Sequence, residues 1–371
     1  MSLILGTRPD RLNPSDERGL VYDDAVRQRT EALYPLVRDL VTPMEWPALA
    51  PLIDGVRRLK AERGAVILAH NYMTPDIFRL IGDFRGDSLQ LAMEAAATDA
   101  PVIVQAGVHF MAETSKILSP EKTVLIPDMR AGCSLAASIT GADVRLIRQA
   151  WPGVPICTYV NTSAEVKAES DITCTSSNAI QAAEHIAREW GVKRVIMIPD
   201  EFLARNVAAN TDLSIIAWRG RCEVHESFSG RDIAEIRAAH PGVTILAHPE
   251  CPPDVLEEAD FAGSTSAIAH FVRERSPRKV VLLTECSMSD NIAADNPGVE
   301  FLKPCNLCPH MKRITVANIY DALRDMKHVV EVDEDIRIRA QRAIEAMLAL
   351  PRPTRPATFL RGRPPVPVEL I

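Results

Sequence analysis

Two cysteines, Cys305 and Cys308, lie three positions apart in the stretch 303–312, and a proline follows the second. Thiolates at this spacing on a tight turn can both face one soft metal ion, and a cysteine–proline ending is common in iron–sulfur loops. A pair alone supplies too few ligands for a closed metal site. It is equally compatible with half of a zinc site, a redox pair or two core thiols, so the rest of the sequence has to distinguish these.

The rest of the sequence contains a repeat in which an apolar strand ends in polar residues. The three strand-like stretches are 65–72, 155–161 and 243–250. Their landmarks His70, Tyr159 and His248 are 89 positions apart in both intervals. A spacing this regular indicates three related structural units.

Each unit continues with a helix and a second strand. A serine follows each landmark by 18 residues, at Ser88, Ser177 and Ser266, and opens an alanine-rich helical pattern. Small hydroxyl residues at a helix start are ordinary N-caps, although such positions can also bind anions. Second apolar strands follow at 101–104, 194–198 and 279–283. The order strand, helix, strand predicts right-handed parallel crossovers.

Each unit closes on a cysteine. Cys133 and Cys222 each lie 63 positions after the landmark of their unit, and Cys308 lies 60 positions after its own. We therefore predict an α/β fold of three homologous three-layer αβα units, with small parallel sheets around a pseudo-threefold axis. Ligands of parallel sheets gather at the carboxyl ends of the strands, so the three cysteines are expected to converge there.

The chain divides accordingly into five parts. We predict an N-terminal extension over 1–45, three αβα units over 46–140, 141–230 and 231–330, and a C-terminal helix with a proline-rich tail over 331–371. The extension should contain a helix at 23–40, followed by a linker at 41–47. Apolar residues at helical spacing predict an amphipathic helix at 331–350, and the tail from Pro351 reads as an extended surface arm.

Three thiolates from three units suit a single 4Fe–4S cluster in which one iron has no protein ligand. Such an open iron can act as a Lewis acid toward substrate oxygens. A fourth thiolate would close the site and favour electron transfer instead. The remaining cysteines break the repeat pattern and are interpreted as core or near-site thiols; they are Cys157, Cys174, Cys251, Cys286 and Cys305.

Polar pairs at the strand ends supply candidates for acid–base chemistry. The pairs are His70 with Tyr72, Tyr159 with Asn161, and His248 with Glu250. A period of two places each pair on one side of its strand. A single histidine after a strand is more often a structural residue, but three matching pairs favour an active site. Glu250 could accept a proton, whereas Tyr72, His70 and His248 could donate or hold one. Hydroxyl groups that could hold carboxylates or phosphate are those of Ser88, Ser177, Thr265 and Ser266.

The composition excludes several other classes of protein. The 371 residues carry a net charge of -7, which argues against a nucleic-acid surface. No apolar run reaches the length of a membrane span, and residues 1–19 lack the pattern of a secretory signal. Eight cysteines without such a signal suggest reduced thiols and a cytoplasmic protein.

These motifs together resemble the quinolinate synthases, the iron–sulfur family of quinolinate synthetase A, over about residues 65–320. The resemblance rests on 69–72 (AHNY), 86–88 (GDS), 131–134 (AGCS), 159–162 (YVNT), 174–178 (CTSSN), 220–225 (GRCEVH), 248–251 (HPEC), 263–266 (GSTS) and 308–312 (CPHMK). It implies condensation of iminoaspartate with dihydroxyacetone phosphate to quinolinate, phosphate and water in de novo NAD biosynthesis. It also implies a functional link to an aspartate oxidase or dehydrogenase that makes iminoaspartate.

The resemblance further implies one oxygen-sensitive 4Fe–4S cluster per chain at the junction of three domains. Its three cluster ligands match Cys133, Cys222 and Cys308, and the residues beside the open iron match Tyr72 and Glu250. The positions that contact substrate match His70, Tyr159, Asn161, His248, Ser88, Ser177 and Thr265.

One departure from the family pattern concerns the third ligand. Some members carry C-x-x-C-x-x-C there, but Leu302 fills the first place in this sequence. A disulfide switch that uses the upstream pair is therefore in doubt, although Cys305 and Cys308 could still pair.

Two other functions remain as alternatives, and a third is disfavoured. One is a different iron–sulfur hydro-lyase acting on a hydroxy acid, and another is an electron carrier or cluster-sensing regulator. A carrier needs a fourth ligand and does not need the strand-end pairs. A radical enzyme that uses S-adenosylmethionine would hold its cysteines in one loop, whereas Cys133 and Cys308 lie 175 positions apart.

Overall fold

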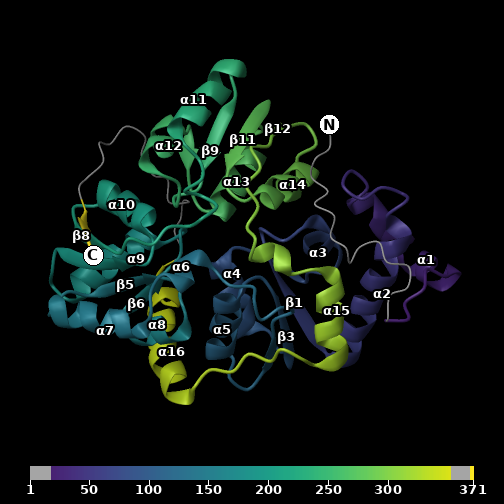
Figure 1. Ribbon diagram of the computed structural model, residues 1–371, viewed down its shortest axis with the longest axis horizontal. Helices are drawn as coiled ribbons and strands as arrows, with labels where there is room; N and C mark the ends of the chain where they lie inside the picture. The colour runs from purple at the N-terminus through teal and green to yellow at the C-terminus, as the bar shows by residue number, and fades with distance from the viewer. Residues whose placement is uncertain (1–17, 352–367) are drawn as a thin grey trace.

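The computed structural model describes residues 18–351 and 368–371. These residues form three lobes, each built on its own small sheet in which every strand pairing is parallel (Figure 1). The first sheet contains β1 (Ala65–His70), β2 (Phe84–Gly86), β3 (Val102–Ala106) and β4 (Thr123–Leu125). The second contains β5 (Ile156–Tyr159), β6 (Ile172–Cys174), β7 (Arg194–Ile198), β8 (Ser214–Ala217) and β13 (Glu369–Leu370). The third contains β9 (Thr244–Ala247), β10 (Phe261–Ala262), β11 (Lys279–Leu283) and β12 (Glu300–Leu302).

The three sheets share one strand order. In the first sheet the order is β2-β1-β3-β4, and the third sheet repeats it as β10-β9-β11-β12. The second sheet reads β6-β5-β7-β8 in the same direction, with β13 added beyond β8. This confirms the prediction of an α/β protein made of three similar units on small parallel sheets.

The strand sequences fit this arrangement because parallel strands are covered by helices on both faces. They therefore read as nearly continuous apolar runs, as in β1 and β11, whose residues are almost all buried. In each unit an aspartate side chain forms a hydrogen bond with the backbone of the first strand. Asp83, Asp171 and Asp260 accept hydrogen bonds from backbone N–H groups of β1, β5 and β9, at 2.7 to 2.9 Å. The repeat read from the sequence is thus also a repeat of local hydrogen bonding.

Helices connect and cover the strands of each unit. The first unit contains α2 (Trp46–Arg63), α3 (Pro75–Leu80), α4 (Ser88–Ala97), α5 (His109–Leu118) and α6 (Ser134–Ala137). The second contains α7 (Gly141–Ala150), α8 (Ala164–Ala168), α9 (Ala179–Glu189) and α10 (Glu201–Asn210). The third contains α11 (Gly230–Ala239), α12 (Pro253–Glu258), α13 (Thr265–Arg275) and α14 (Cys286–Asp295). A 3₁₀ turn, η3 (Met311–Arg313), follows the third unit.

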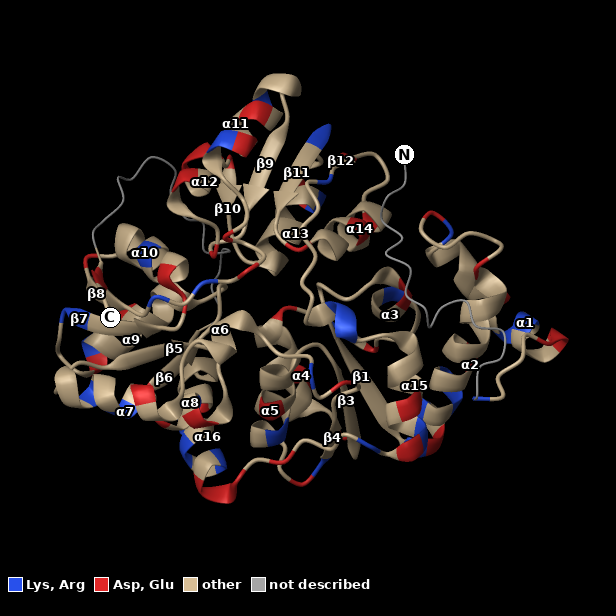
Figure 2. Ribbon diagram, viewed as in Figure 1, with Lys and Arg blue, Asp and Glu red and all other residues tan. Residues whose placement is uncertain are grey.

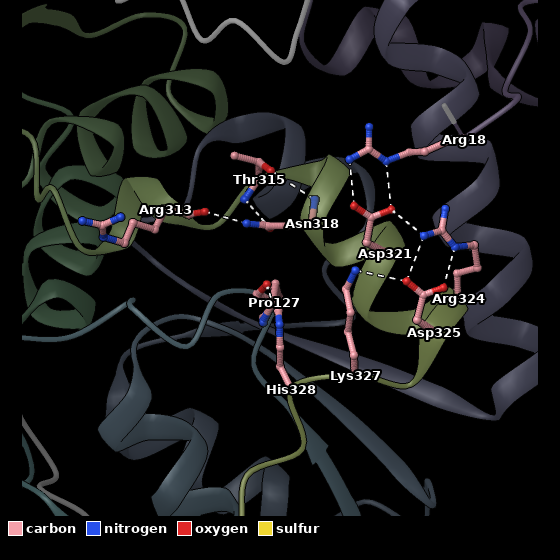
Figure 3. A network of polar contacts seen from close by, with 10 residues as sticks. All are labelled: Arg18, Pro127, Arg313, Thr315, Asn318, Asp321, Arg324, Asp325, Lys327 and His328. Carbon is pink, nitrogen blue, oxygen red and sulfur yellow. Dashed lines mark hydrogen bonds and ion pairs between the residues drawn. The ribbon is translucent and has the colours of Figure 1, made fainter. Parts of the chain in front are cut away.

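The next helix, α15 (Val316–Asp325), returns the chain to the first unit, where it packs against α2. Thr315 and Asn318 form a capping box at its start, because each side chain accepts from the other residue's backbone N–H (Figure 3). On its outer face Asp321 receives two hydrogen bonds from Arg18, at 2.9 and 2.7 Å. The helix therefore fastens the end of the third unit to the first.

The remaining helices lie outside the three units. The helix predicted at 331–350 is confirmed as α16 (Glu334–Leu348), which packs its buried face on α8 and β6. The helix predicted at 23–40 is shorter: α1 (Asp24–Thr30) gives way to the 3₁₀ turn η2 (Glu31–Leu36), which contains Pro35. Proline lacks the N–H that an α-helix interior requires, which explains the early end.

Parts of the predicted extension and tail, residues 1–17 and 352–367, lie outside the described residues. The described end of the tail, residues 368–371, is extended and contains the strand β13, which pairs with β8 at the edge of the second sheet. The boundaries of the five predicted parts stay predictions.

Positively and negatively charged residues alternate along the outer helices, for example along α11 and α16 (Figure 2). Ion pairs within these helices, such as Arg231 with Glu235 and Arg337 with Glu334, follow from this alternation. Within 18–351 and 368–371, no helix is long and apolar enough to cross a bilayer.

Candidate active site

The three repeat cysteines lie at the same place in their units, beyond the carboxyl end of the fourth strand. Cys133 follows β4 and is the N-cap of α6, Cys222 follows β8, and Cys308 follows β12. All three line one cavity. The convergence predicted from the repeat therefore occurs.

The surroundings of these thiols suit a bound iron–sulfur cluster. Burial raises the pKa of Cys133 to about 12, and it also raises the pKa values of Cys222 and Cys308. A buried thiolate is costly without a compensating positive charge, which iron supplies. Among the described lining residues these three are the only cysteines, a donor set that fits a cluster with one open iron.

The loops that carry the cysteines are joined to one another around this cavity. The Ser134 hydroxyl donates to the carbonyl of Arg221 at 3.3 Å and accepts from the N–H of Glu223 at 3.2 Å. The Glu223 carboxylate in turn pairs with His310 Nε2 at 3.0 Å. Contacts between neighbouring loops thus hold the three sulfurs in one place.

Glu250 also lines this cavity, and its buried carboxylate has hydrogen-bonding partners on both oxygens. Its carboxylate accepts from the Tyr159 hydroxyl, and its second oxygen lies 2.8 Å from His225 Nδ1. Burial alone would raise the pKa of Glu250, but the adjacent His248 and His225 and these hydrogen bonds lower it to about 2. The carboxylate is therefore ionised and oriented, as a general base must be.

Tyr72 approaches from the first unit and stays protonated. Burial raises its pKa well above the ordinary value, and the nearby charge of Glu250 raises it further. Its hydroxyl lies 2.7 Å from the hydroxyl of Thr284, which also lies 3.0 Å from His225 Nε2. Tyr72 and Glu250 are thus linked by hydrogen bonds through His225 and Thr284.

Two further histidines complete the inner wall. Burial lowers the pKa of His70 to about 4 and that of His248 to about 3, so both are neutral near pH 7. His248 stacks on His225 with ring centroids 4.5 Å apart, and His70 meets Tyr72 edge to face. Both can act as hydrogen-bonding groups for a substrate without adding charge.

The expected substrate contacts divide into two kinds. Ser88, Asn161 and Thr265 line the cavity, and the Asn161 side-chain oxygen is buried with no hydrogen-bond partner among the described residues. An orphaned acceptor of this kind is costly unless a ligand donates to it. Ser177 is not among the described lining residues. Its hydroxyl donates to Asp87 at 2.9 Å, and Ser266 donates to the same carboxylate oxygen at 2.8 Å.

A second group of potential metal ligands consists of Cys222, His225 and Glu250, whose ligand atoms lie within 4.8 Å of one another. The histidine and carboxylate of this group already bond to each other and to Thr284 and Tyr159. Their lone pairs are therefore engaged, whereas the three repeat thiols are available. The three repeat thiols are therefore the better candidates for metal ligands.

The other cysteines differ partly from expectation. Cys157, Cys174 and Cys251 are buried free thiols, as predicted. Cys305, however, forms a disulfide with Cys286 at the start of α14, so it does not pair with Cys308. The chain brings these two together because the backbone at 306 pairs with that at 285, a contact between distant segments.

The lysine that ends the 308–312 motif, Lys312, has a structural role. Lys312 Nζ lies 2.8 Å from the fully buried carboxylate of Glu285 and donates to the backbone carbonyl of Tyr72 at 2.7 Å. The backbone N–H of Cys308 donates to the same carboxylate at 3.4 Å. The lysine therefore ties the loop of the third cysteine to the strand end that carries Tyr72.

Sequence reasoning missed His225, Thr284 and Asp87 as parts of this site. His225 stood inside the 220–225 motif without a role of its own. Thr284 directly follows the second strand of its unit, and the next residue, Glu285, is equivalent to the buried Asp200 after β7. Polar residues after the second strands were a usable signal, because those strands end at the same edge as the first strands.

Gly220 provides a test of how tightly the loop of Cys222 is held. A Cβ at this position would overlap the carbonyl oxygen of Pro199 and the hydroxyl of Ser138. Gly220→Ala should therefore displace Cys222 and remove most of the cluster's visible absorbance. Gly298→Ala, where nothing lies within 4 Å, is the control and should keep it. Equal absorbance in both variants would show that the loop tolerates the shift.

Comparison with known proteins agrees with this geometry. Residues 54–349 match the family model "Quinolinate synthetase A protein". The chain is 59% identical over 360 residues to a quinolinate synthase of Caulobacter vibrioides, covering 96% of this chain and 98% of that protein. It is 62% identical over 318 residues to quinolinate synthase 2 of Mesorhizobium japonicum (86% and 97% covered), and 63% identical over 298 residues to a quinolinate synthase of Xylella fastidiosa (80% and 87% covered). The chain belongs to the quinolinate synthetase A family.

Proposed function

We propose that this protein is a quinolinate synthase, which condenses iminoaspartate with dihydroxyacetone phosphate to quinolinate, phosphate and water in NAD biosynthesis. The observation that carries the proposal is one cavity that gathers the three repeat cysteines with the Glu250 and Tyr72 pair. Close identity to curated quinolinate synthases over almost the whole chain supports the same function.

Cys133, Cys222 and Cys308 are proposed to hold one 4Fe–4S cluster. When bound, the cluster supplies a Lewis acid at its open iron, which makes a substrate hydroxyl a better leaving group. The protein's part is to position the substrate beside that iron and to move protons. Apolar walls from Val108 and Phe110 limit the water that can compete there.

Glu250 and Tyr72 are proposed to carry the proton transfers. The condensation requires loss of water, in which a base takes a proton from carbon while a hydroxyl leaves the neighbouring carbon. The Glu250 carboxylate is the proposed base, since it is ionised and is held in place by hydrogen bonds to Tyr159 and His225. The Tyr72 phenol, which retains its proton, is the acid that converts the leaving hydroxyl to water. Tyr159 holds the carboxylate in place through its hydroxyl.

Substrate anchoring is proposed for the polar groups that line the rest of the cavity. Asn161 offers an acceptor for an N–H or O–H group of substrate. Ser88 and Thr265, at the starts of α4 and α13, offer donors for phosphate and carboxylate. His70 and His248 contact the same substrate as neutral groups. Ser177 stays in the proposed set because it fixes Asp87, which also lines the cavity.

Ser88 should prove important for binding rather than for chemistry. Loss of one hydrogen bond to a charged group costs about 1.5–3 kcal/mol. Ser88→Ala should therefore raise KM roughly ten- to hundredfold, with kcat and cluster absorbance little changed. Ser119→Ala, whose hydroxyl donates to the Ala95 carbonyl away from the cavity, is the control and should leave KM unchanged. An unaltered KM in Ser88→Ala would show that this serine does not bind substrate and only begins the helix α4.

Iminoaspartate is proposed to come from an aspartate oxidase or an aspartate dehydrogenase. An imine of this type hydrolyses in water, so its producer and consumer must work close together in time. The protein is expected to show full turnover only when such an enzyme generates the imine in the same anaerobic reaction.

The direct test of the proposed function is product formation from the two substrates. Anaerobically prepared protein, mixed with dihydroxyacetone phosphate and an imine-generating enzyme, should form quinolinate, and omission of either substrate should stop it. The alternative function, a hydro-lyase acting on a hydroxy acid, predicts no quinolinate but dehydration of one hydroxy acid in a panel. That outcome would replace the proposal.

A further inference from the structure

We propose that Lys167 is a buried positive charge that stabilises the anionic groups gathered in the active-site cavity, on which it acts from behind the wall at Phe110. The proposal rests on the proposed function, in which the cavity holds a cluster on three thiolates together with two anionic substrates. It gives a functional role to a side chain of α8 that does not itself line the cavity. Lys167 is therefore a positioning residue for anions and not a catalytic residue.

The cavity wall carries negative charge without a matching basic side chain. Its described lining contains three carboxylates, those of Asp87, Glu223 and Glu250, and neither lysine nor arginine. Iminoaspartate would add two carboxylates to this enclosure, and dihydroxyacetone phosphate would add a phosphate. Because like charges repel strongly where water is scarce, a cation close to the wall would lower the free energy of the loaded site.

Lys167 lies directly behind residues of the wall. Its side chain is fully buried. The ammonium nitrogen Nζ lies 5.5 Å from the centroid of the Phe110 ring, and Phe110 lines the cavity. The same nitrogen donates a hydrogen bond to the backbone carbonyl of Thr162, the residue after the lining residue Asn161. The charge therefore borders on the cavity wall at two places.

The charge of Lys167 is not neutralised by an ion pair. Among the described residues, the contacts of its ammonium are a backbone carbonyl and the face of an aromatic ring. Glu113 attracts it electrostatically, but this carboxylate accepts a hydrogen bond from the N–H of Ala164 at 3.1 Å and lies 3.7 Å from His109 Nδ1. A buried ammonium without a carboxylate partner is costly, so its positive field remains available to anions in the cavity.

Lys312 offers an instructive contrast on another side of the cavity. It also lies behind the wall, where it donates to the backbone carbonyl of Tyr72. Its Nζ, however, lies 2.8 Å from the buried carboxylate of Glu285, so the two charges largely cancel. Of these two lysines, Lys167 is therefore the one that can compensate negative charge in the cavity.

The ammonium keeps its proton in this environment. Burial lowers the pKa of Lys167 to about 8, while the charges of Glu113 and Cys133 act to raise it. A pKa of about 8 leaves the side chain mainly protonated at neutral pH. Anions bound in the cavity would raise the pKa further, since negative charge nearby favours the charged form of a lysine. The positive charge is thus present when it is needed.

The test separates the charge of Lys167 from its hydrogen bond. Lys167→Met replaces the ammonium by an apolar group of similar length, whereas Lys167→Gln keeps a hydrogen-bond donor but not the charge. The probe is quinolinate, which carries two carboxylates, and its Kd is measured on cluster-loaded protein. Both variants should bind quinolinate about tenfold more weakly, because a unit charge acting across one aromatic ring changes the affinity for a dianion by about that factor.

Two further measurements do not depend on turnover. The reduction potential of the cluster, followed by anaerobic redox titration, should become more negative in both variants, because loss of a nearby positive charge disfavours the added electron. Thermal unfolding should show that Lys167→Met is at least as stable as the wild type, since an apolar side chain replaces a buried charge that lacks a carboxylate partner. Weaker binding with undiminished stability would exclude misfolding as the cause.

Lys122→Met is the matched control. Lys122 is also half-buried or deeper along its stem and donates to the backbone carbonyls of Ala95 and Thr98. It precedes β4, at the edge of the first sheet opposite the cavity. Its loss should leave both the Kd for quinolinate and the reduction potential of the cluster unchanged.

Three results would each overturn the role of Lys167. One is a Kd for quinolinate within threefold of wild type in Lys167→Met, and another is an unchanged reduction potential in both variants. The third is wild-type binding by Lys167→Gln alone, which would show that the hydrogen bond to Thr162 matters and the charge does not. Failure of the proposed function would look different, since the wild type would then form no quinolinate from the two substrates.

Discussion

Glu250→Gln should lower kcat by about 10²–10⁴-fold while substrate binding and the cluster spectrum survive. The substitution keeps the shape of the side chain and its contact with the Tyr159 hydroxyl, but an amide cannot take a proton from carbon. General base catalysis of this kind contributes a factor of that size. Quinolinate formation under saturating substrate, together with visible absorbance and a binding measurement with quinolinate, checks the expectation.

The control for this substitution is Glu257→Gln, an exposed glutamate on α12 in the same unit. It should leave kcat, KM and absorbance unchanged. A Glu250→Gln protein with kcat within threefold of wild type would show that the base lies elsewhere, and His248 or Tyr72 would be examined next.

Each of three single substitutions should remove most of the cluster: Cys133→Ser, Cys222→Ser and Cys308→Ser. A serine hydroxyl is a harder and far less acidic ligand than a thiol, so it cannot replace a thiolate on iron. Iron and sulfide content after anaerobic preparation, with visible absorbance, measures the loss. The same variants should form no quinolinate.

Two other cysteines serve as matched controls. Cys157→Ser changes a buried thiol on β5, and Cys305→Ser breaks the disulfide with Cys286; both should keep the cluster. The Cys305 loop keeps its other contacts, among them the N–H of Cys286 donating to the carbonyl of Asn306 at 3.0 Å. Loss of the cluster in Cys157→Ser, with retention in Cys133→Ser, would refute the ligand assignment.

The sequence predicted the residues whose positions follow from the repeat. The spacing of His70, Tyr159 and His248 marks the carboxyl ends of β1, β5 and β9, and the three repeat cysteines mark the ends of β4, β8 and β12. Because equivalent strands of similar units end at equivalent places, spacing along the chain translated into proximity. In a protein built from homologous units, the spacing of the repeat therefore predicts which residues lie together in the site.

What the sequence could not supply depends on contacts between units. One such contact is the hydrogen bond from the Ser177 hydroxyl to Asp87 of another unit. The pairing of Cys286 with Cys305 and the bridging role of Thr284 likewise follow from how separate segments meet. Neither repeat spacing nor helix and strand patterns record which side chain of one unit reaches which side chain of the next.

Two local features of the chain also differ from what the helix and strand patterns predicted. Pro35 shortened the predicted helix at 23–40, a stop that the sequence could have indicated. The pairing of β13 with β8 could not be expected in the same way, because a two-residue strand carries too little periodicity to be recognised.

Turnover as a function of cluster content tests the proposed role of the cluster directly. Protein containing between zero and one 4Fe–4S cluster per chain, set by anaerobic reconstitution, is assayed for quinolinate formation from iminoaspartate and dihydroxyacetone phosphate. If the cluster is required for turnover, as proposed, the rate should rise in proportion to cluster content and should be zero in cluster-free protein. Quinolinate formation by cluster-free protein, or none by fully loaded protein, would contradict it.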